Sequence, residues 1–277
     1  MRLCRFAGGY GLLQGDEVVD ITRHVPAIGD TIGDPLVHAL PRLEALDTKG
    51  LAQASRRRAA DVKLLSPVRN PTKILAAPNN YREHTAEMQH VDPNAGARMA
   101  NMEEAGFFLK ATSSLVGPSE GIVQRFPERR TDHEVELVVV IGEVISQPVE
   151  AAHVARFIAG YSIGLDITLR GPEERSLRKS IDTYTVLGPT LVTPDEAGDV
   201  PESRMRLSVN GELRQSTLLS DMVFNVEEQI AYASRFYTLY PGDLIYTGTP
   251  SGVGPIRPGD VIHADISGLG EMEVHVR

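Results

Sequence analysis

The 277-residue sequence predicts a mainly β protein of the α+β class, with a small N-terminal domain over residues 1–68 and a larger domain over residues 69–277. Short apolar stretches bounded by glycine and proline turns dominate the larger part, as is typical of strands. Only one or two segments there place apolar residues at helical spacing. The two prolines of Ser66–Pro71 indicate a linker, which sets the domain boundary.

The N-terminal part predicts a β-hairpin followed by a helix. Leu12–Asp20 places two apolar runs on either side of a Gln-Gly-Asp turn, which indicates the hairpin. We expect a helical stretch over residues 43–59. The basic run Arg56–Arg58 is short, and we interpret it as a solvated surface near the linker.

In the larger domain the clearest helix begins at Asn225. Asn225 and Glu228 stand at the spacing of a capping box, and apolar residues follow at helical spacing as far as Tyr237. Two matched Pro-Gly-Asp turns, at residues 241–243 and 258–260, each precede an apolar run that predicts a strand.

Composition excludes several classes of function. The net charge of −9 argues against a nucleic-acid-binding protein. No apolar run is long enough to span a membrane, and the N-terminus lacks the core of a signal peptide. Cys4 is the single cysteine, so no intrachain disulfide forms; this fits the cytoplasm, with Cys4 a small buried apolar residue. The chain also lacks a phosphate-binding loop and a dinucleotide fingerprint.

The segment Asp132–Gly142 carries the most informative chemistry. It predicts a buried strand, on which Glu134 and Glu136 point to the same side. Two carboxylates this close repel unless a cation lies between them, and a hard divalent cation prefers oxygen ligands. The alternative is an edge strand with a solvated acidic face.

Asp166 ends a second apolar stretch, residues 158–165, and can join the two glutamates if the strands are neighbours. Three carboxylates suit Mg²⁺, Mn²⁺ or Ca²⁺ better than zinc, which favours nitrogen and sulfur ligands. The alternative for Asp166 is an ordinary turn or cap residue.

His84 and Glu87 stand one helical turn apart in a short helix that opens near Asn79, so both lie on one face. A carboxylate beside an imidazole orients it and raises its proton affinity, which suits a general base. Pairs at this spacing also occur by chance. Lys179 can hold the charge of a substrate carboxylate or enolate, or it is one more surface lysine.

Together these segments resemble the fumarylacetoacetate hydrolase family. The resemblance covers roughly residue 70 to the C-terminus, and the N-terminal part also resembles the small domain of that family. The matching segments occur in the family's order: Lys73–Leu75, Asn80–Glu87, Phe107–Leu115, Asp132–Gly142, Gly160–Asp166, Lys179–Pro189, Thr247–Gly254 and Pro258–Asp260.

The resemblance implies a catalytic domain with a mixed β-roll and an assembly as a homodimer. It implies that Glu134, Glu136 and Asp166 bind the metal ion, with Mg²⁺ expected and Mn²⁺ or Ca²⁺ as alternatives. His84 and Glu87 would activate water, and Lys179 would assist at the metal-bound substrate. Substrate contacts would come from Tyr81, Arg82 and Thr249.

The sequence departs from the family pattern in one region. Leu165 stands where the family usually has Asn, Glu173 and Glu174 occupy a region where Gln is common, and the connection from Asp166 to Lys179 is short and lacks Trp. These departures concern the substrate pocket and remove no metal ligand.

The resemblance therefore implies a metal-dependent hydrolase that cleaves a C–C bond in a β-diketo acid of the acylpyruvate type, in the breakdown of aromatic or related compounds. The alternatives are decarboxylation of a 2-oxo acid such as oxaloacetate, isomerisation of a hydroxymuconate-like acid, or a catalytically silent metal- or ligand-binding module. Residues 89–106 are polar and carry two glycines, so they form either a closing lid or an ordinary surface loop.

Overall fold

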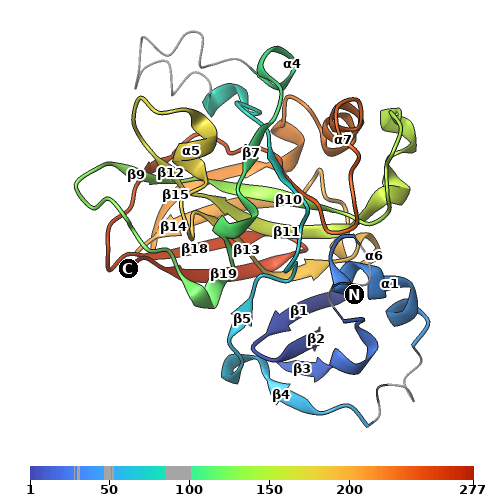
Figure 1. Cartoon of the computed structure of the whole chain (residues 1–277). Coiled ribbons are helices and arrows are strands. Elements are labelled where there is room, and N and C mark those ends of the chain that lie inside the picture. The colour runs from blue at the N-terminus through green and yellow to red at the C-terminus, as the bar shows by residue number, and fades with distance from the viewer. Residues whose placement is uncertain (28, 30–31, 47–50, 52, 85–100) are drawn as a thin grey trace.

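The predicted mainly β, α+β class is confirmed. The computed structural model describes all residues except 28, 30–31, 47–50, 52 and 85–100. Strands form one large sheet and two small ones, and in Figure 1 the N-terminal strands lie at one end of the molecule while α4, α5 and α7 lie at the other.

The N-terminal strands extend the large sheet. Its strands from the first 65 residues are β1 (Arg2–Phe6), β2 (Gly9–Gln14), β3 (Glu17–Asp20), β4 (Arg56–Arg58) and β5 (Leu64–Leu65). The predicted hairpin is confirmed, because β2 and β3 pair from Gly11–Asp20 to Gln14–Glu17. Strand β1 pairs with β13 (Thr185–Val192), so the sheet crosses the predicted domain boundary.

The centre of this sheet holds the predicted buried strands. Its other strands are β6 (Ile74–Ala76), β7 (Phe108–Lys110), β8 (Leu115–Val116), β10 (Val135–Ile141), β11 (Ile158–Asp166) and β16 (Leu244–Tyr246). Strand β10 lies between β11 and β16 and is buried along its whole length. The alternative of an edge strand with a solvated acidic face is therefore wrong.

Two smaller sheets complete the β structure. One contains β9 (Thr131–His133), β12 (Thr168–Leu169) and β17 (Gly254–Pro255). The other contains β14 (Arg204–Val209), β15 (Glu212–Leu218), β18 (Val261–Ile266) and β19 (Gly270–His275). Strands β16 and β18 follow the two Pro-Gly-Asp turns, as predicted.

The helices are short and lie outside the sheets. Those that lie wholly within the described residues are α1 (Pro35–Glu44), α4 (Met102–Ala105), α5 (Arg175–Lys179), α6 (Pro194–Ala197) and α7 (Val226–Ser234). The 3-10 helices are η1 (Thr22–His24), η2 (Ala59–Asp61), η4 (Thr112–Ser114), η5 (Pro118–Glu120), η6 (Ala151–His153), η7 (Ala155–Phe157) and η8 (Leu219–Asp221). The predicted capping box at α7 is confirmed.

The predicted helix over residues 43–59 is wrong in its last part, and residues 47–50 and 52 of that range lie outside the described residues. Asp34 caps α1 by accepting hydrogen bonds from the backbone of Leu36 and Val37, and Pro35 occupies the first turn, so the helix begins there and ends at Glu44. Residues 56–58 form β4 instead, because they pair with β3. Their side chains are exposed, as the interpretation of a solvated basic run required.

The main hydrophobic core lies against β10 and β11. It is formed by alternate residues of these strands, among them Val135, Leu137 and Leu165, together with residues of α7 and of the sheet of β14, β15, β18 and β19. Since neighbouring side chains on a strand point to opposite faces, Glu134 and Glu136 face away from this core. None of the described helices is long and apolar enough to cross a membrane.

Candidate metal centre and active site

The three predicted metal ligands meet where the chain passes from the large sheet to the sheet of β9, β12 and β17. Glu134 is the residue between β9 and β10, and Asp166 is the last residue of β11. The backbone N–H of Asp166 donates to the carbonyl of Glu134 over 2.9 Å, which aligns the two strand ends. Glu136 lies opposite Gly164, where a side chain would clash with Val138 and Tyr246.

A carboxylate oxygen from each of Glu134, Glu136 and Asp166 lies within 4.8 Å of the other two, and all three side chains are buried. Hard oxygen donors converging in a buried site are what Mg²⁺, Mn²⁺ and Ca²⁺ require. The donor set therefore fits a divalent cation, and Asp166 is not an ordinary turn residue.

Two buried lysines compensate the carboxylates. Lys179, from α5, donates to Glu134 Oε2 and Asp166 Oδ2 over 2.6 Å each and to Thr168 Oγ1 over 2.7 Å. Lys110, at the end of β7, forms an ion pair with Asp166 and donates to the carbonyl of Tyr184 over 3.0 Å. Lys179 is thus part of the site and not a surface lysine.

The two glutamates differ in how far their charge is compensated. Burial acts to raise the pKa of Glu134, but Lys179 and Arg170 outweigh it and hold the pKa below its usual range. Burial raises the pKa of Glu136, and the charge of Asp166 adds to this effect. Among the described residues, Glu136 accepts a hydrogen bond from the backbone N–H of Gly248, over 2.7 Å.

Thr249 lies next to this contact, and Gln215 fixes its orientation. The Gln215 oxygen accepts from the backbone N–H of Val135 over 3.1 Å, and its nitrogen donates to the carbonyl of Pro250 over 3.0 Å. These two bonds set the amide orientation, so the nitrogen also donates to Thr249 Oγ1, over 2.8 Å. Because the Thr249 hydroxyl oxygen accepts this bond, its own proton is directed away from Gln215 and can be donated to another oxygen.

The predicted catalytic pair is described only in part. His84 is 6% exposed, and it is among the groups whose charge lowers the pKa of Glu134, which places it near the carboxylates. Glu87 lies outside the described residues, as does most of the proposed lid; residues 101–106 contain α4.

The predicted substrate residues Tyr81 and Arg82 line a cavity of about 440 Å³. Tyr81 is buried and Arg82 is exposed. Glu83 and Asp221 also line this cavity and give it an acidic wall beside Arg82.

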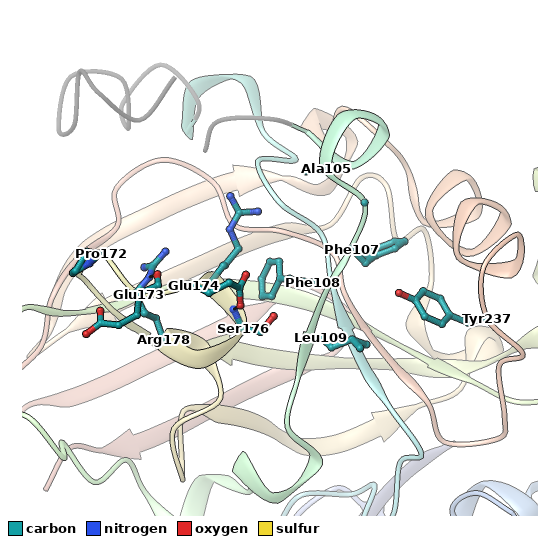
Figure 2. A pocket seen from close by; sticks show the side chains of 12 residues that line it. Ala105, Phe107, Phe108, Leu109, Pro172, Glu173, Glu174, Ser176, Arg178 and Tyr237 are labelled. Carbon is teal, nitrogen blue, oxygen red and sulfur yellow. Dashed lines mark hydrogen bonds between the residues drawn. The ribbon is translucent and has the colours of Figure 1, made fainter. Parts of the chain in front are cut away.

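A second cavity, of about 500 Å³, lies between β7 and α5 (Figure 2). Phe107 and Tyr237 form its wall on one side, residues 172–176 and Arg178 form the other, and the ring of Phe108 stands between them. The Lys179 ammonium lies 5.4 Å from the centre of that ring, so the cavity adjoins the metal centre.

The departures from the family pattern affect the surroundings of the site. Leu165 is fully buried in the main core and pairs with Val135, so it faces away from the carboxylates. Glu173 accepts two hydrogen bonds from Arg129, over 2.9 and 2.7 Å, and lines the second cavity.

Sequence reasoning missed the residues that compensate and orient the ligands. Lys110 was part of a matching segment but received no role, and Arg170 and Gln215 were not singled out. Arg170 donates to Asp132 over 2.7 Å and to Glu134 over 3.1 Å. Asp132 and Glu134 are two residues apart, so their side chains point to the same side of the strand. This spacing was the available signal that Asp132, a further buried acid, needs a cationic partner such as Arg170.

Comparison with known proteins decides the family. Residues 73–277 match the family model described as fumarylacetoacetate (FAA) hydrolase C-terminal. The chain belongs to the fumarylacetoacetate hydrolase family. This confirms the resemblance inferred from the sequence.

Several relatives match over most of their length. A maleylpyruvate hydrolase of Aquipseudomonas alcaligenes is 45% identical, and the match covers 100% of this chain and 99% of the length of that protein. The crystal structure of a maleylpyruvate hydrolase from Sphingobium sp. SYK-6 with manganese(II) and pyruvate has a TM-score of 0.84 and 37% identity, covering 100% of this chain and 98% of its own. An oxaloacetate tautomerase of Rattus norvegicus is 34% identical over 92% of this chain and 82% of its own.

Proposed function

We propose that this family member is a metal-dependent hydrolase that cleaves the C–C bond of an acylpyruvate of the maleylpyruvate type, releasing pyruvate and a carboxylic acid. The observation that carries the proposal is the buried triad of Glu134, Glu136 and Asp166 beside Lys179. The full-length similarity to a maleylpyruvate hydrolase supports the same reaction, as does the relative that holds manganese and pyruvate. The sequence-based prediction of a metal-dependent hydrolase agrees with both.

The chain's own residues provide the remaining chemistry. When bound, a divalent cation would polarise the 2-oxo group and favour the enolate that leaves. His84 would take a proton from the attacking water, with Glu87 as its orienting partner. The Lys179 ammonium would contribute positive charge where the enolate develops. Thr249, whose hydroxyl accepts from Gln215, would donate its proton to a substrate oxygen.

Product analysis tests the proposal. The protein is incubated with acylpyruvates and with oxaloacetate, each with Mn²⁺, with Mg²⁺ and with EDTA. Equal amounts of pyruvate and a carboxylic acid, formed only with metal, are expected. Release of carbon dioxide from oxaloacetate faster than with the same metal ion alone would establish a decarboxylase instead. No turnover of any substrate would favour a silent binding module.

Interconversion of the keto and enol forms of a 2-oxo acid is a second candidate, because one relative is an oxaloacetate tautomerase. That reaction needs the same stabilised enolate and breaks no C–C bond. Ultraviolet absorbance of oxaloacetate separates the two, since tautomerisation changes the enol signal without forming pyruvate.

The role of His84 has a direct test. His84→Ala should lower turnover by roughly 10²-fold or more while Mn²⁺ affinity changes little, because the imidazole acts on water. His153→Ala is the matched control, because that histidine is exposed. Loss of Mn²⁺ binding in His84→Ala would make His84 a ligand, and an unchanged rate would remove it from the mechanism.

Finer features belong to the same proposal. Mg²⁺ as the physiological ion, an assembly of two copies, a place in aromatic breakdown and a cytoplasmic location stay predictions. The division into domains of residues 1–68 and 69–277 also stays a prediction, and expression of residues 69–277 alone tests it. Since β1 pairs with β13, we expect that fragment to be less stable than the whole chain.

A further inference from the structure

Asn80 is a buried amide four residues before His84, and the proposed reaction assigns it no part. The residue is 1% exposed, and both polar atoms of its side chain are hydrogen-bonded. Residues 82–84 are helical, so His84 lies about one helical turn beyond the position that Asn80 fixes. A buried polar group whose bonds are all satisfied makes its surroundings rigid and specifies one local arrangement.

The Asn80 amide joins two distant segments of the chain. Its nitrogen donates to the carbonyl of Phe224 over 2.9 Å and to the carbonyl of Thr247 over 2.8 Å. Its oxygen accepts from the backbone N–H of Phe224, over 2.8 Å. These bonds set the amide orientation, because exchanging the oxygen and the nitrogen would break all three. Asn80 thus holds its own segment to residues 224 and 247 at the same time.

The residues that follow Thr247 belong to the site. Gly248 donates its backbone N–H to Glu136, and Thr249 carries the hydroxyl that is proposed to contact the substrate. Thr247 itself is bonded to the strand of the ligands, since its backbone N–H and its hydroxyl donate to the carbonyl of Leu137 over 3.1 and 2.9 Å. A hydrogen bond to the Thr247 carbonyl therefore also restrains the contact to Glu136 and the place of the substrate hydroxyl.

Gly248 packs closely against Asn80. Its φ is 99°, in the left-handed region that favours glycine. A Cβ at this position would lie 2.7 Å from the Cβ of Asn80, which is closer than two carbon atoms approach without a bond. Only glycine leaves room for Asn80 here, so the two segments meet closely where the amide joins them.

We propose that Asn80 is a positioning residue, which holds His84 in a fixed place relative to the proposed metal ligands and to Thr249. A general base must lie within hydrogen-bond reach of the water that it deprotonates, and a displacement of about 1 Å can cost roughly 100-fold in rate. His84 is buried, and it is among the groups whose charge lowers the pKa of Glu134, as expected for a base held beside the ligands. This inference rests on the proposed function for the role of His84, and it adds the residue that acts through it.

A double-mutant cycle tests the inference. Asn80→Asp keeps the shape of the side chain, but a carboxyl group donates at most one hydrogen bond and, when ionised, repels the carbonyls of Phe224 and Thr247. We expect kcat for acylpyruvate cleavage to fall about 10- to 100-fold, while KM and the Kd of Mn²⁺ each change less than about threefold. In the His84→Ala background the same substitution should change kcat by less than about threefold, because the base through which it acts is absent.

Asn210→Asp is the matched control. Asn210 is exposed in the turn between β14 and β15, and its amide also donates and accepts, to Asp260 over 2.8 Å and from the backbone N–H of Val261 over 2.9 Å. This substitution should leave kcat unchanged. Asn80→Ser, which buries no charge, takes the place of Asn80→Asp in the cycle if the aspartate variant does not fold.

Hydrogen exchange measures the positioning without the reaction. In the Mn²⁺-loaded protein, Asn80→Asp should speed the exchange of the backbone amides in residues 81–84 and 247–249 about tenfold, the value of one lost hydrogen bond. Asn210→Asp should leave the exchange of both segments unchanged.

Each outcome decides one point. An unchanged kcat in Asn80→Asp overturns the inference, and so do unchanged exchange and an equal fall in kcat with and without His84. A loss of Mn²⁺ affinity as large as the fall in kcat also overturns it, because Asn80 would then act through Glu136. Faster exchange of both segments in a protein that cleaves no acylpyruvate would retain the positioning by Asn80 and reject the proposed reaction.

Discussion

Replacing Glu134 or Glu136 by glutamine should affect the metal-free protein differently, although both changes weaken metal binding. Glu134 accepts from Lys179 over 2.6 Å and from Arg170 over 3.1 Å, so Glu134→Gln leaves two cations facing a neutral amide. Removing one partner of a buried ion pair costs about 3–5 kcal/mol of stability. Glu136 accepts a hydrogen bond from the backbone N–H of Gly248, and the amide oxygen of a glutamine at this position can accept the same bond.

The carboxylate of Glu136 is also repelled by that of Asp166, which contributes to its raised pKa. Glu136→Gln should therefore leave the metal-free protein as stable as before or stabilise it by about 1 kcal/mol, since one pKa unit corresponds to about 1.4 kcal/mol. Urea unfolding in EDTA measures both variants. Far-ultraviolet circular dichroism is the suitable probe, because the chain has no tryptophan.

Adding Mn²⁺ completes the experiment. At a concentration of one hundred times its Kd, the ion stabilises the unmodified protein by about 2.7 kcal/mol. Both variants should lose most of this gain, because each lacks one charged ligand. A metal-free Glu136→Gln protein destabilised as strongly as Glu134→Gln would refute the proposed distribution of charge, and a full Mn²⁺ gain in either variant would remove that residue from the ligand set.

Two further changes test features outside the set of proposed metal ligands. Gln215→Glu replaces the donor to Thr249 Oγ1 by an acceptor, so the hydroxyl of Thr249 donates its proton to residue 215 and no longer to the substrate. We therefore expect kcat/KM to fall about tenfold. Calorimetry should show that the Mn²⁺ affinity changes less than about threefold. Burial raises the pKa of Cys4 to about 12. Because the folded pKa lies above the unfolded one, the thiol contributes stability below about pH 9 that is lost as the pH rises toward 12. Urea unfolding at pH 9 to 11 should show the unmodified protein losing about 1.4 kcal/mol per pH unit more than Cys4→Ala, and parallel losses would contradict this.

The proposed metal ligands were within reach of the sequence because each depends on a local pattern. Strand alternation places Glu134 and Glu136 on one face, and Asp166 marks the end of the next strand. The burial of β10 also followed from its apolar run. What the pattern leaves open is the pairing of β10 with β11, which brings Asp166 to the glutamates.

The compensating residues depend on contacts between distant parts of the chain. Lys110 lies 56 residues from Asp166, and Gln215 lies 80 residues from Val135. No periodicity connects such positions. The helix predicted over residues 43–59 failed for a different reason, since the Asp34-Pro35 start signal lies before the range considered and residues 56–58 are held by β3.

The charge of the whole cluster bears on the substrate it accepts. With the carboxylates ionised, as metal binding requires, the three proposed metal ligands and the described residues linked to them through ion pairs contain equal numbers of acids and cations. The acids are Asp132, Glu134, Glu136 and Asp166, and the cations are Lys110, Arg130, Arg170 and Lys179. A divalent ion then leaves the cluster with two positive charges in a largely buried site, where charge interactions are weakly screened. A substrate with two carboxylates neutralises both charges, whereas one with a single carboxylate leaves one of them uncompensated. The field of the cluster therefore favours a diacid, so kcat/KM should be higher for an acylpyruvate that ends in a second carboxylate than for the matching carboxamide, and equal values would contradict this balance of charge.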